Sequence, residues 1–134
     1  MKGLVCFGLV FLSLGMSACH APSAPVVQTH EYTIKQKCPT LKNMKVGEVL
    51  IFNAPENPST GYQWQLLQPL KIFKTEETYL QNHADEKAVG VAGTKTFRFT
   101  AEKPGQDYIQ LVHVRAWESS KEPDQKWLCR IRVS

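Results

Sequence analysis

The six residues 57–62 restrict the fold of this chain more than any other stretch, because they form a stiff turn between two strand-like runs. Asn57 precedes a proline, which favours an extended backbone at the asparagine. Pro58 has a fixed φ and no N–H group, so it cannot continue a sheet ladder. Gly61 reaches backbone angles that other residues adopt only at a cost. We therefore expect a rigid loop that joins two β-strands.

Strand-like segments with turn signals between them occupy most of the chain, and no stretch has a convincing helical period. Leu50, Phe52 and Ala54 share one face of such a segment, and Phe97 and Phe99 share one face of another. The expected strands cover residues 31–37, 46–54, 61–68, 70–78, 94–102, 107–115 and 126–133. The sequence therefore predicts an all-β fold, an immunoglobulin-like β-sandwich of about seven strands with Trp64 in its core.

The N-terminus has the features of an export signal. Lys2 precedes an apolar run over residues 4–14, which is too short to span a bilayer. Mostly small residues follow, and Cys19 comes directly after Met16-Ser17-Ala18, a pattern that resembles the lipobox of bacterial lipoproteins. We expect residues 1–18 to be a lipoprotein signal peptide, residues 19–30 a Pro- and Ala-rich tether, and residues 31–134 one domain.

The same resemblance implies a location. Cys19 would carry the lipid, so the chain would be exported and anchored in the bacterial cell envelope. His20 after the cysteine, rather than aspartate, favours the outer membrane, facing the periplasm or the cell surface. The alternative is ordinary cleavage with Cys19 left as a spare thiol. We expect a monomer.

Two of the four cysteines remain for the domain, because Cys6 leaves with the signal peptide and Cys19 is the lipid site. Cys38 and Cys129 each fall on a plausible inward face, Cys38 through a period-2 face that would extend from Tyr32. In an exported protein we expect them to form a disulfide. A bridge across so long a loop contributes roughly 4 kcal/mol in the chain-entropy model. The alternative is two buried free thiols.

Charge and side-chain chemistry argue against several function classes. The net charge is only +4, and no run of basic residues suggests a nucleic-acid partner. No histidine has metal-ligand spacing, so neither a metal nor a cofactor is expected. Glu76 and Glu77 are adjacent on a strand and point to opposite faces, which excludes them as a paired acid and base. Ser59 has no motif that would activate it as a nucleophile. We expect no catalytic residues and no enzyme activity.

Three segments remain, and they are Asn57-Pro58-Ser59-Thr60-Gly61-Tyr62, Gly90-Val91-Ala92-Gly93 and Arg115-Ala116-Trp117. Together they resemble the chagasin family of inhibitors of papain-like cysteine peptidases. That family carries N-P-T-T-G-[FY], G-x-G-G and R-P-W, in this order, on an immunoglobulin-like sandwich. The resemblance extends over about residues 31–134. It implies that these three loops bind a papain-like cysteine peptidase.

The mechanism that the resemblance implies is a reversible, tight block of the peptidase cleft. The first loop would lie over the catalytic cysteine, with Thr60 close to it. The second loop, residues 90–93, would lie along the non-primed side, and Trp117 would pack on the primed side with Arg115 supporting it.

The chain departs from the family at two positions. Ala92 replaces a glycine, which would cost about 1 kcal/mol if that position required a positive φ. Ala116 replaces a proline, which removes rigidity from the third loop. These departures bear on the strength of inhibition more than on the function itself. They are the best support for the alternative function, an immunoglobulin-like surface binding or structural lipoprotein module that has no inhibitory activity.

Overall fold

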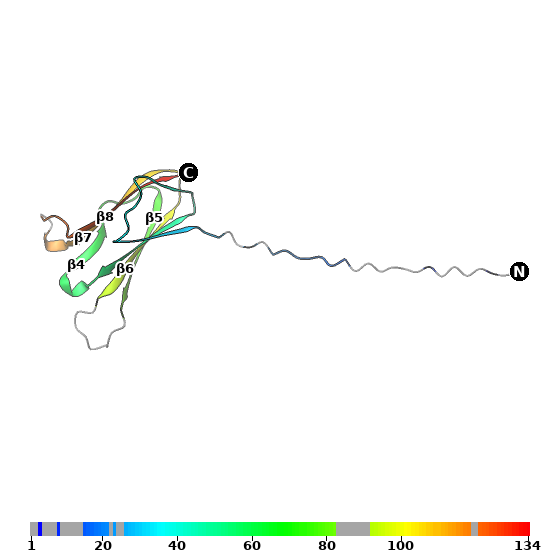
Figure 1. Ribbon diagram of the computed structural model, residues 1–134, viewed down its shortest axis with the longest axis horizontal. Coiled ribbons are helices and arrows are strands. Elements are labelled where there is room, and N and C mark those ends of the chain that lie inside the picture. Colours follow the sequence, from blue (N-terminus) through cyan, green and yellow to red (C-terminus); the bar gives the residue numbers. More distant parts are fainter. Residues whose placement is uncertain are drawn as a thin grey trace.

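The computed structural model describes residues 15–21, 26–82, 92–118 and 121–134, together with Gly3, Gly8 and Ser23. These residues form eight strands and two single-turn 3-10 helices (Figure 1). The strands are β1 (Thr29–Thr33), β2 (Lys42–Met44), β3 (Val49–Glu56), β4 (Tyr62–Leu66), β5 (Phe73–Gln81), β6 (Gly93–Ala101), β7 (Gly105–Arg115) and β8 (Gln125–Val133). The helices are η1 (Pro58–Thr60) and η2 (Ala116–Glu118).

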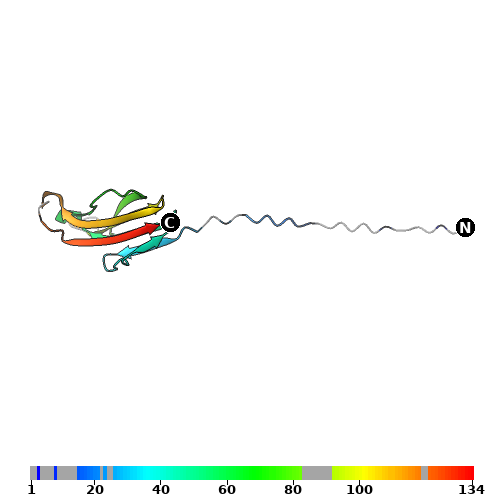
Figure 2. The same cartoon turned by 90° about the horizontal axis from the view of Figure 1, so that it is seen from above.

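The strands form two four-stranded sheets that pack face to face (Figure 2). Sheet 1 has the order β1-β3-β6-β5, and sheet 2 has the order β2-β8-β7-β4. The all-β sandwich predicted from the sequence is thus confirmed, with one strand more than expected. The additional strand is β2, which has only three residues and pairs in parallel with β8. A segment of three residues is too short to show an alternation of apolar and polar side chains, so the sequence did not predict it as a strand.

The first strand is shorter than the sequence suggests. β1 ends at Thr33, and the N–H of Gln36 donates to the Thr33 carbonyl at 3.0 Å, which closes a turn. The prediction of a continuous strand to residue 37, with Cys38 on its inward face, was therefore wrong. Cys38 reaches the core through this turn instead.

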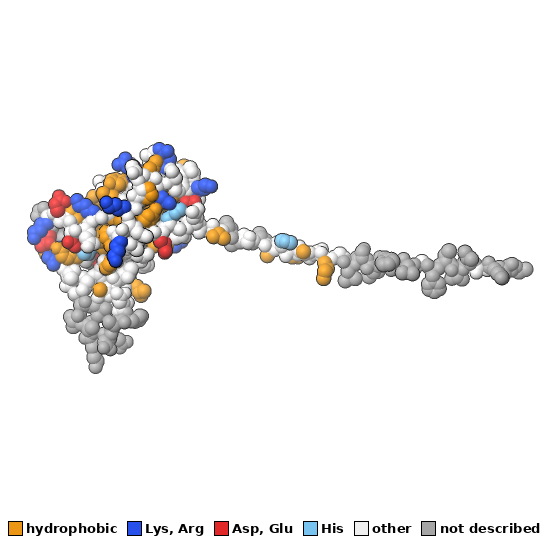
Figure 3. Space-filling view, in the orientation of Figure 1, with side chains coloured by type: hydrophobic (Ala, Val, Ile, Leu, Met, Phe, Trp, Pro, Cys, Tyr) orange, Lys and Arg blue, Asp and Glu red, His pale blue; other side chains and the backbone are white. Residues whose placement is uncertain are grey.

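The core consists of the facing sides of the two sheets. Phe97 and Phe99 of β6 are fully buried, as their spacing predicts. Phe52 contacts both Trp64 and Trp127, with ring centroids 5.3 and 4.7 Å apart. Each buried side chain of this kind stabilises the fold by roughly 1.5–3 kcal/mol relative to exposure. Basic, acidic and apolar side chains are interspersed on the face of the domain seen in Figure 3.

The predicted disulfide is present between Cys38 and Cys129, whose Cα atoms are 5.2 Å apart. It closes a loop with a sequence separation of 91 residues. We expect the double variant Cys38→Ser/Cys129→Ser to lose about 4 kcal/mol of unfolding free energy, because the unfolded chain regains loop entropy. Urea unfolding measures this loss, and Cys19→Ser serves as the control. An unchanged unfolding midpoint in the double variant would contradict the prediction.

A histidine–carboxylate pair fixes β1 to the turn before β3. His30 Nε2 lies 3.0 Å from Glu48 Oε2, and both side chains are mostly buried. The hydrogen bond with His30 lowers the pKa of Glu48 below its usual value of 4.5, against the opposing effect of burial. In the unfolded chain Glu48 therefore binds a proton at a higher pH than in the folded domain. Its contribution to stability is full above about pH 4.5 and is lost as the pH falls through the folded pKa.

The pH dependence of this contribution is measurable by urea unfolding of wild type and Glu48→Gln between pH 7 and pH 3. We expect the wild type to be the more stable protein at pH 7, with the difference shrinking below about pH 4.5. Glu102→Gln, at an exposed position, is the matched control. A difference that is the same at pH 7 and pH 3 would show that the pair with His30 does not act in this way.

Within the described ranges, the structure contains no helix that is long and apolar enough to cross a membrane.

Candidate functional site

Three strand connections emerge at the same end of the sandwich, and the strand register places them there. Glu56, which ends β3, pairs with Gly93, which in turn pairs with Gln81 at the end of β5. On the other sheet, Tyr62 at the start of β4 pairs with Arg115 at the end of β7. The strand ends that are joined by the connections β3–β4, β5–β6 and β7–β8 therefore lie at one end of the sandwich. We call these connections the first, second and third loops (Figure 1).

The chain enters the domain at the opposite end. β1 runs parallel to β3, and its first residue, Thr29, pairs with Val49, the first residue of β3. Because β3 runs towards the first loop, Thr29 lies at the end of the sandwich remote from all three loops. Anything attached through the N-terminal segment is thus separated from the loops by the length of the domain.

The first loop is held in shape by its own side chains. The Asn57 side-chain oxygen accepts the Ser59 N–H at 3.1 Å and the Ser59 hydroxyl at 2.7 Å. The Thr60 hydroxyl donates to the Asn57 carbonyl at 2.7 Å. Gly61 has a φ of 79°, and its N–H donates to the Pro58 carbonyl. The rigid loop predicted from the sequence, with glycine at a positive φ, is confirmed.

The third loop packs directly against the first. The Arg115 Nε–H donates to the Thr60 carbonyl at 3.0 Å, and the guanidinium carbon lies 4.2 Å from the centre of the Tyr62 ring. The Trp117 indole lies on Gly61, so closely that a Cβ atom on this glycine would overlap the ring. Trp117 is nevertheless 70% exposed. It therefore presents an aromatic surface to solvent from a fixed position.

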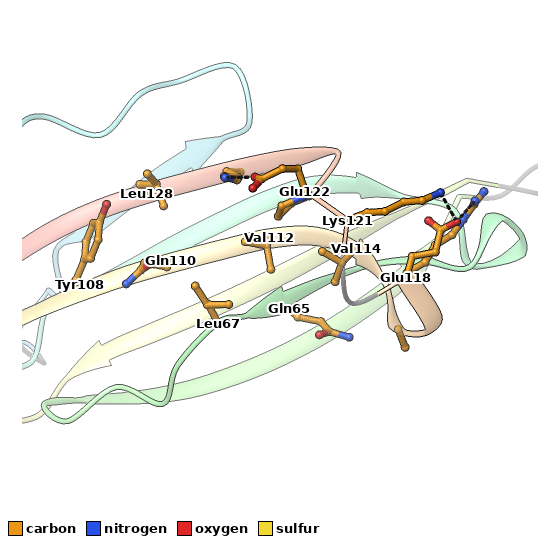
Figure 4. A pocket seen from close by; sticks show the side chains of 14 residues that line it. Gln65, Leu67, Tyr108, Gln110, Val112, Val114, Glu118, Lys121, Glu122 and Leu128 are labelled. Carbon is orange, nitrogen blue, oxygen red and sulfur yellow. Dashed lines mark hydrogen bonds and ion pairs between the residues drawn. The ribbon is translucent and has the colours of Figure 1, made fainter.

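The base of the third loop is supported by the outer face of sheet 2. A groove of about 530 Å³ extends from the loop along this face, with Val114 and Glu118 near the loop and Leu67 further from it (Figure 4). Two ion pairs involve the loop, of which Lys121 to Glu118 at 3.2 Å lies within it and Lys126 of β8 to Glu122 at 3.0 Å joins it to sheet 2. Exposed pairs of this kind contribute at most about 1 kcal/mol each. They add to the order that Arg115 provides.

Only part of the second loop belongs to the described residues, since Gly90 and Val91 lie outside them. Gly93 is buried at the start of β6, and Tyr79 covers it so closely that no side chain would fit. Ala92 is exposed, and its carbonyl accepts the Asn82 N–H at 3.2 Å. Within the described part of the chain only glycines have a positive φ. Ala92 therefore does not have a positive φ, and the free-energy cost that a positive φ would impose on alanine does not apply.

Comparison with known proteins assigns the family. Residues 43–131 match the family model described as Chagasin family peptidase inhibitor I42. The chain belongs to the chagasin family. It is thus a peptidase inhibitor by family and not an enzyme. Among the residues that the structure describes, no group of three or more His, Cys, Asp or Glu side chains is placed to hold a metal ion.

Individual relatives agree with this assignment. The chain is 25% identical to chagasin of Trypanosoma cruzi over 112 residues, which covers 79% of this chain and 99% of chagasin. It is 30% identical to amoebiasin-2 of Entamoeba histolytica over 97 residues, which covers 70% of this chain and 76% of that protein. A crystal structure of a cysteine protease inhibitor from Entamoeba histolytica matches with a TM-score of 0.69 at 22% identity. The match covers 83% of this chain and 100% of that structure, and it shows the shared fold.

Sequence reasoning missed two residues that shape the loops. Glu56 is buried directly before the first loop, whereas the sequence suggests that the strand ends at Ala54. His113 stacks between Tyr62 and Trp64, with ring centroids 5.1 and 5.0 Å away, and its Nδ1 lies 3.2 Å from Asp124. The cross-strand pairing of Trp64 with His113 could be found only once the register of β4 and β7 was known.

Proposed function

We propose that this inhibitor acts reversibly on papain-like cysteine peptidases, by filling the active-site cleft with its three loops. The observation that carries the proposal is the packing of the first loop against the third through Gly61, Arg115 and Trp117. These loops lie at the end of the domain opposite to the point where the N-terminal segment enters. Support also comes from the similar solved structure from Entamoeba histolytica, which is described as a cysteine protease inhibitor.

The first loop is suited to cover the catalytic cysteine without being cleaved. Its tip is a single 3-10 turn, in which the N–H groups of Thr60 and Gly61 donate to the carbonyls of Asn57 and Pro58. The carbonyl of Asn57 accepts from Thr60, and the carbonyl of Thr60 accepts from Arg115. A peptide bond held in this way is not presented in the extended geometry that a nucleophile must reach for attack. We expect the loop to bind as a fixed obstacle.

Preorganisation would supply much of the affinity. A loop that is already ordered loses little conformational entropy when it binds. Trp117 adds a large aromatic surface, and tryptophan is among the residue types that dominate binding energy at interfaces. The second loop, with Gly90, Val91, Ala92 and Gly93, is assigned to the non-primed side of the cleft by family resemblance. The proposal requires neither a metal nor a cofactor.

Titration of active-site-calibrated papain with the domain from His20 onward, disulfide intact, tests this function. We expect linear loss of activity to a one-to-one endpoint, with recovery on dilution and no cleavage of the inhibitor. Trypsin, pepsin and thermolysin serve as controls from other catalytic classes and should be unaffected. A folded domain that leaves papain and a panel of related peptidases fully active would instead favour a binding module without inhibitory activity.

We further propose that the domain is held at a membrane through a lipid on Cys19, in the outer membrane of the bacterial envelope. Cys19 directly follows the expected signal peptide, whose last residues are mostly small, and its thiol is exposed. Both features support this proposal. Since the chain enters at the end remote from the loops, the anchored domain would direct its loops away from the bilayer. Membrane fractionation of cells that express wild type or Cys19→Ser tests the anchor. Equal release of both proteins from the membrane would overturn it.

A further inference from the structure

Glu56 is the one charged side chain that is buried among the residues that the structure describes, with 7% of its surface exposed. It is the last residue of β3 and directly precedes Asn57, the first residue of the first loop. A buried carboxylate is unfavourable unless it is well hydrogen-bonded. The position of this side chain therefore calls for a specific partner.

That partner is the backbone on the far side of the first loop. Glu56 Oε1 accepts the Trp64 N–H at 2.6 Å, a short hydrogen bond of the charge-assisted kind. β4 is an edge strand of sheet 2, so an N–H that points away from β7 has no partner strand. The carboxylate supplies the missing acceptor. In return, the Trp64 Nε1–H donates to the Pro55 carbonyl at 3.1 Å.

These two hydrogen bonds join strands that share no ladder. β3 belongs to sheet 1 and β4 to sheet 2, so the first loop crosses from one sheet to the other. The hydrogen bonds inside the loop set its local shape but not its direction relative to the sandwich. The Glu56–Trp64 contact fixes the two ends of the loop to each other. Because Glu56 also pairs with Gly93, the same residue joins the base of the first loop to the base of the second.

We propose that Glu56 is a positioning residue for inhibition. It holds the first loop in the orientation that enters the peptidase cleft, and it does so through Trp64, without touching the peptidase. The inference rests on the proposed function. If the Glu56–Trp64 hydrogen bond is lost, only a fraction of the molecules has the first loop in the orientation that enters the cleft. The apparent affinity for the peptidase then falls by that fraction. The loss should appear in the association rate constant, because the contacts in the complex are unchanged.

Two variants of Glu56 separate the acceptor from the charge. Glu56→Leu has a similar size but leaves the Trp64 N–H without an acceptor, whereas Glu56→Gln keeps an oxygen in the same place. We expect Glu56→Leu to lower the association rate constant for papain about 10-fold or more, with dissociation changed less than about 2-fold. Glu56→Gln should stay within about 3-fold of the unsubstituted domain in both.

Two controls distinguish positioning from general stability. Phe99→Leu, in the core and away from the loops, should lower the unfolding midpoint without changing association. If Glu56→Leu does not fold, Glu56→Asp replaces it, because its carboxylate is one methylene too short to reach Trp64. The proposal would be overturned if the variant that lacks the Glu56 acceptor kept an unchanged association rate constant, or if only its dissociation rate constant changed. Either result would leave the inhibitory function intact.

Hydrogen exchange of the Trp64 amide provides a readout that needs no peptidase. In Glu56→Leu this amide should exchange about 10-fold faster or more, while core amides of β6 keep their rates relative to global unfolding. An unchanged exchange rate of the Trp64 amide would show that Glu56 does not hold the loop through this hydrogen bond. If the unsubstituted domain failed to inhibit papain, the proposed function would be at fault, and this measurement would still decide whether Glu56 orders the loop.

Discussion

Replacing Gly61 with alanine should raise the inhibition constant for papain by about 100-fold, because two costs add at this position. Gly61 has a φ of 79°, where a side chain costs about 1–2 kcal/mol. The new methyl group would also overlap the Trp117 indole, so the ring must move. A single substitution thus disturbs the first loop and displaces the main aromatic contact of the third. Steady-state inhibition of papain measures the change.

Gly47→Ala is a matched control for this substitution. Gly47 also has a positive φ, 91°, but a Cβ there would meet nothing within 4 Å. It lies at the end of the domain where the chain enters. Gly47→Ala should lose about 1–2 kcal/mol of unfolding free energy from its φ alone, and Gly61→Ala at least as much, but only Gly61→Ala should lose inhibition. Equal inhibition by the two variants would contradict a role for the Gly61–Trp117 contact.

Trp117→Ala should weaken inhibition by roughly 30- to 1,000-fold, which corresponds to about 2–4 kcal/mol for a central aromatic contact. The side chain is 70% exposed in the free domain, so its removal exposes little core. We therefore expect the unfolding midpoint to stay nearly constant while the inhibition constant rises. Inhibition assays combined with thermal unfolding on the same protein preparations separate the two effects.

Leu67→Ala is the comparison for Trp117→Ala. Leu67 is also apolar and 55% exposed, but it follows the end of β4 that is remote from the loops. Its removal should leave inhibition unchanged. If both substitutions weakened inhibition equally, the contact surface would extend well beyond the three loops. If neither did, Trp117 would not contact the peptidase.

The sequence predicts those parts of the fold that depend on local periodicity. Phe97 and Phe99 alternate with polar residues, and both are buried on the inner face of β6. The conformation of Gly61 follows from its position after Asn57-Pro58, because few residues other than glycine end such a turn. Trp117 lies just beyond a strand, and the sequence alone left its exposure open. The structure resolves this through the contact with Gly61, which is distant in sequence.

Features that depend on pairing between strands were not predictable in the same way. The sequence suggests that Pro55 ends its strand, yet β3 continues to Glu56. The continuation is possible because β1 pairs with β3 only as far as Asn53, so β3 has no neighbour on that side at Pro55. The burial of Glu56 likewise depends on other strands, because Glu56 pairs with Gly93 of β6 and its carboxylate accepts the Trp64 N–H of β4. No local pattern in the sequence identifies a carboxylate whose partner lies eight residues away on the other sheet.

Competition for the cleft tests the central claim most directly. The affinity of the fluorescently labelled domain is measured for papain with an empty cleft and for papain whose catalytic cysteine carries a covalent peptidyl inhibitor that fills the substrate sites. If the three loops occupy the cleft, binding to the blocked enzyme should be weaker by about 100-fold or more, because the two occupants exclude each other. Equal affinity for the empty and the blocked enzyme would show that the domain binds papain elsewhere, and it would contradict inhibition by filling of the cleft.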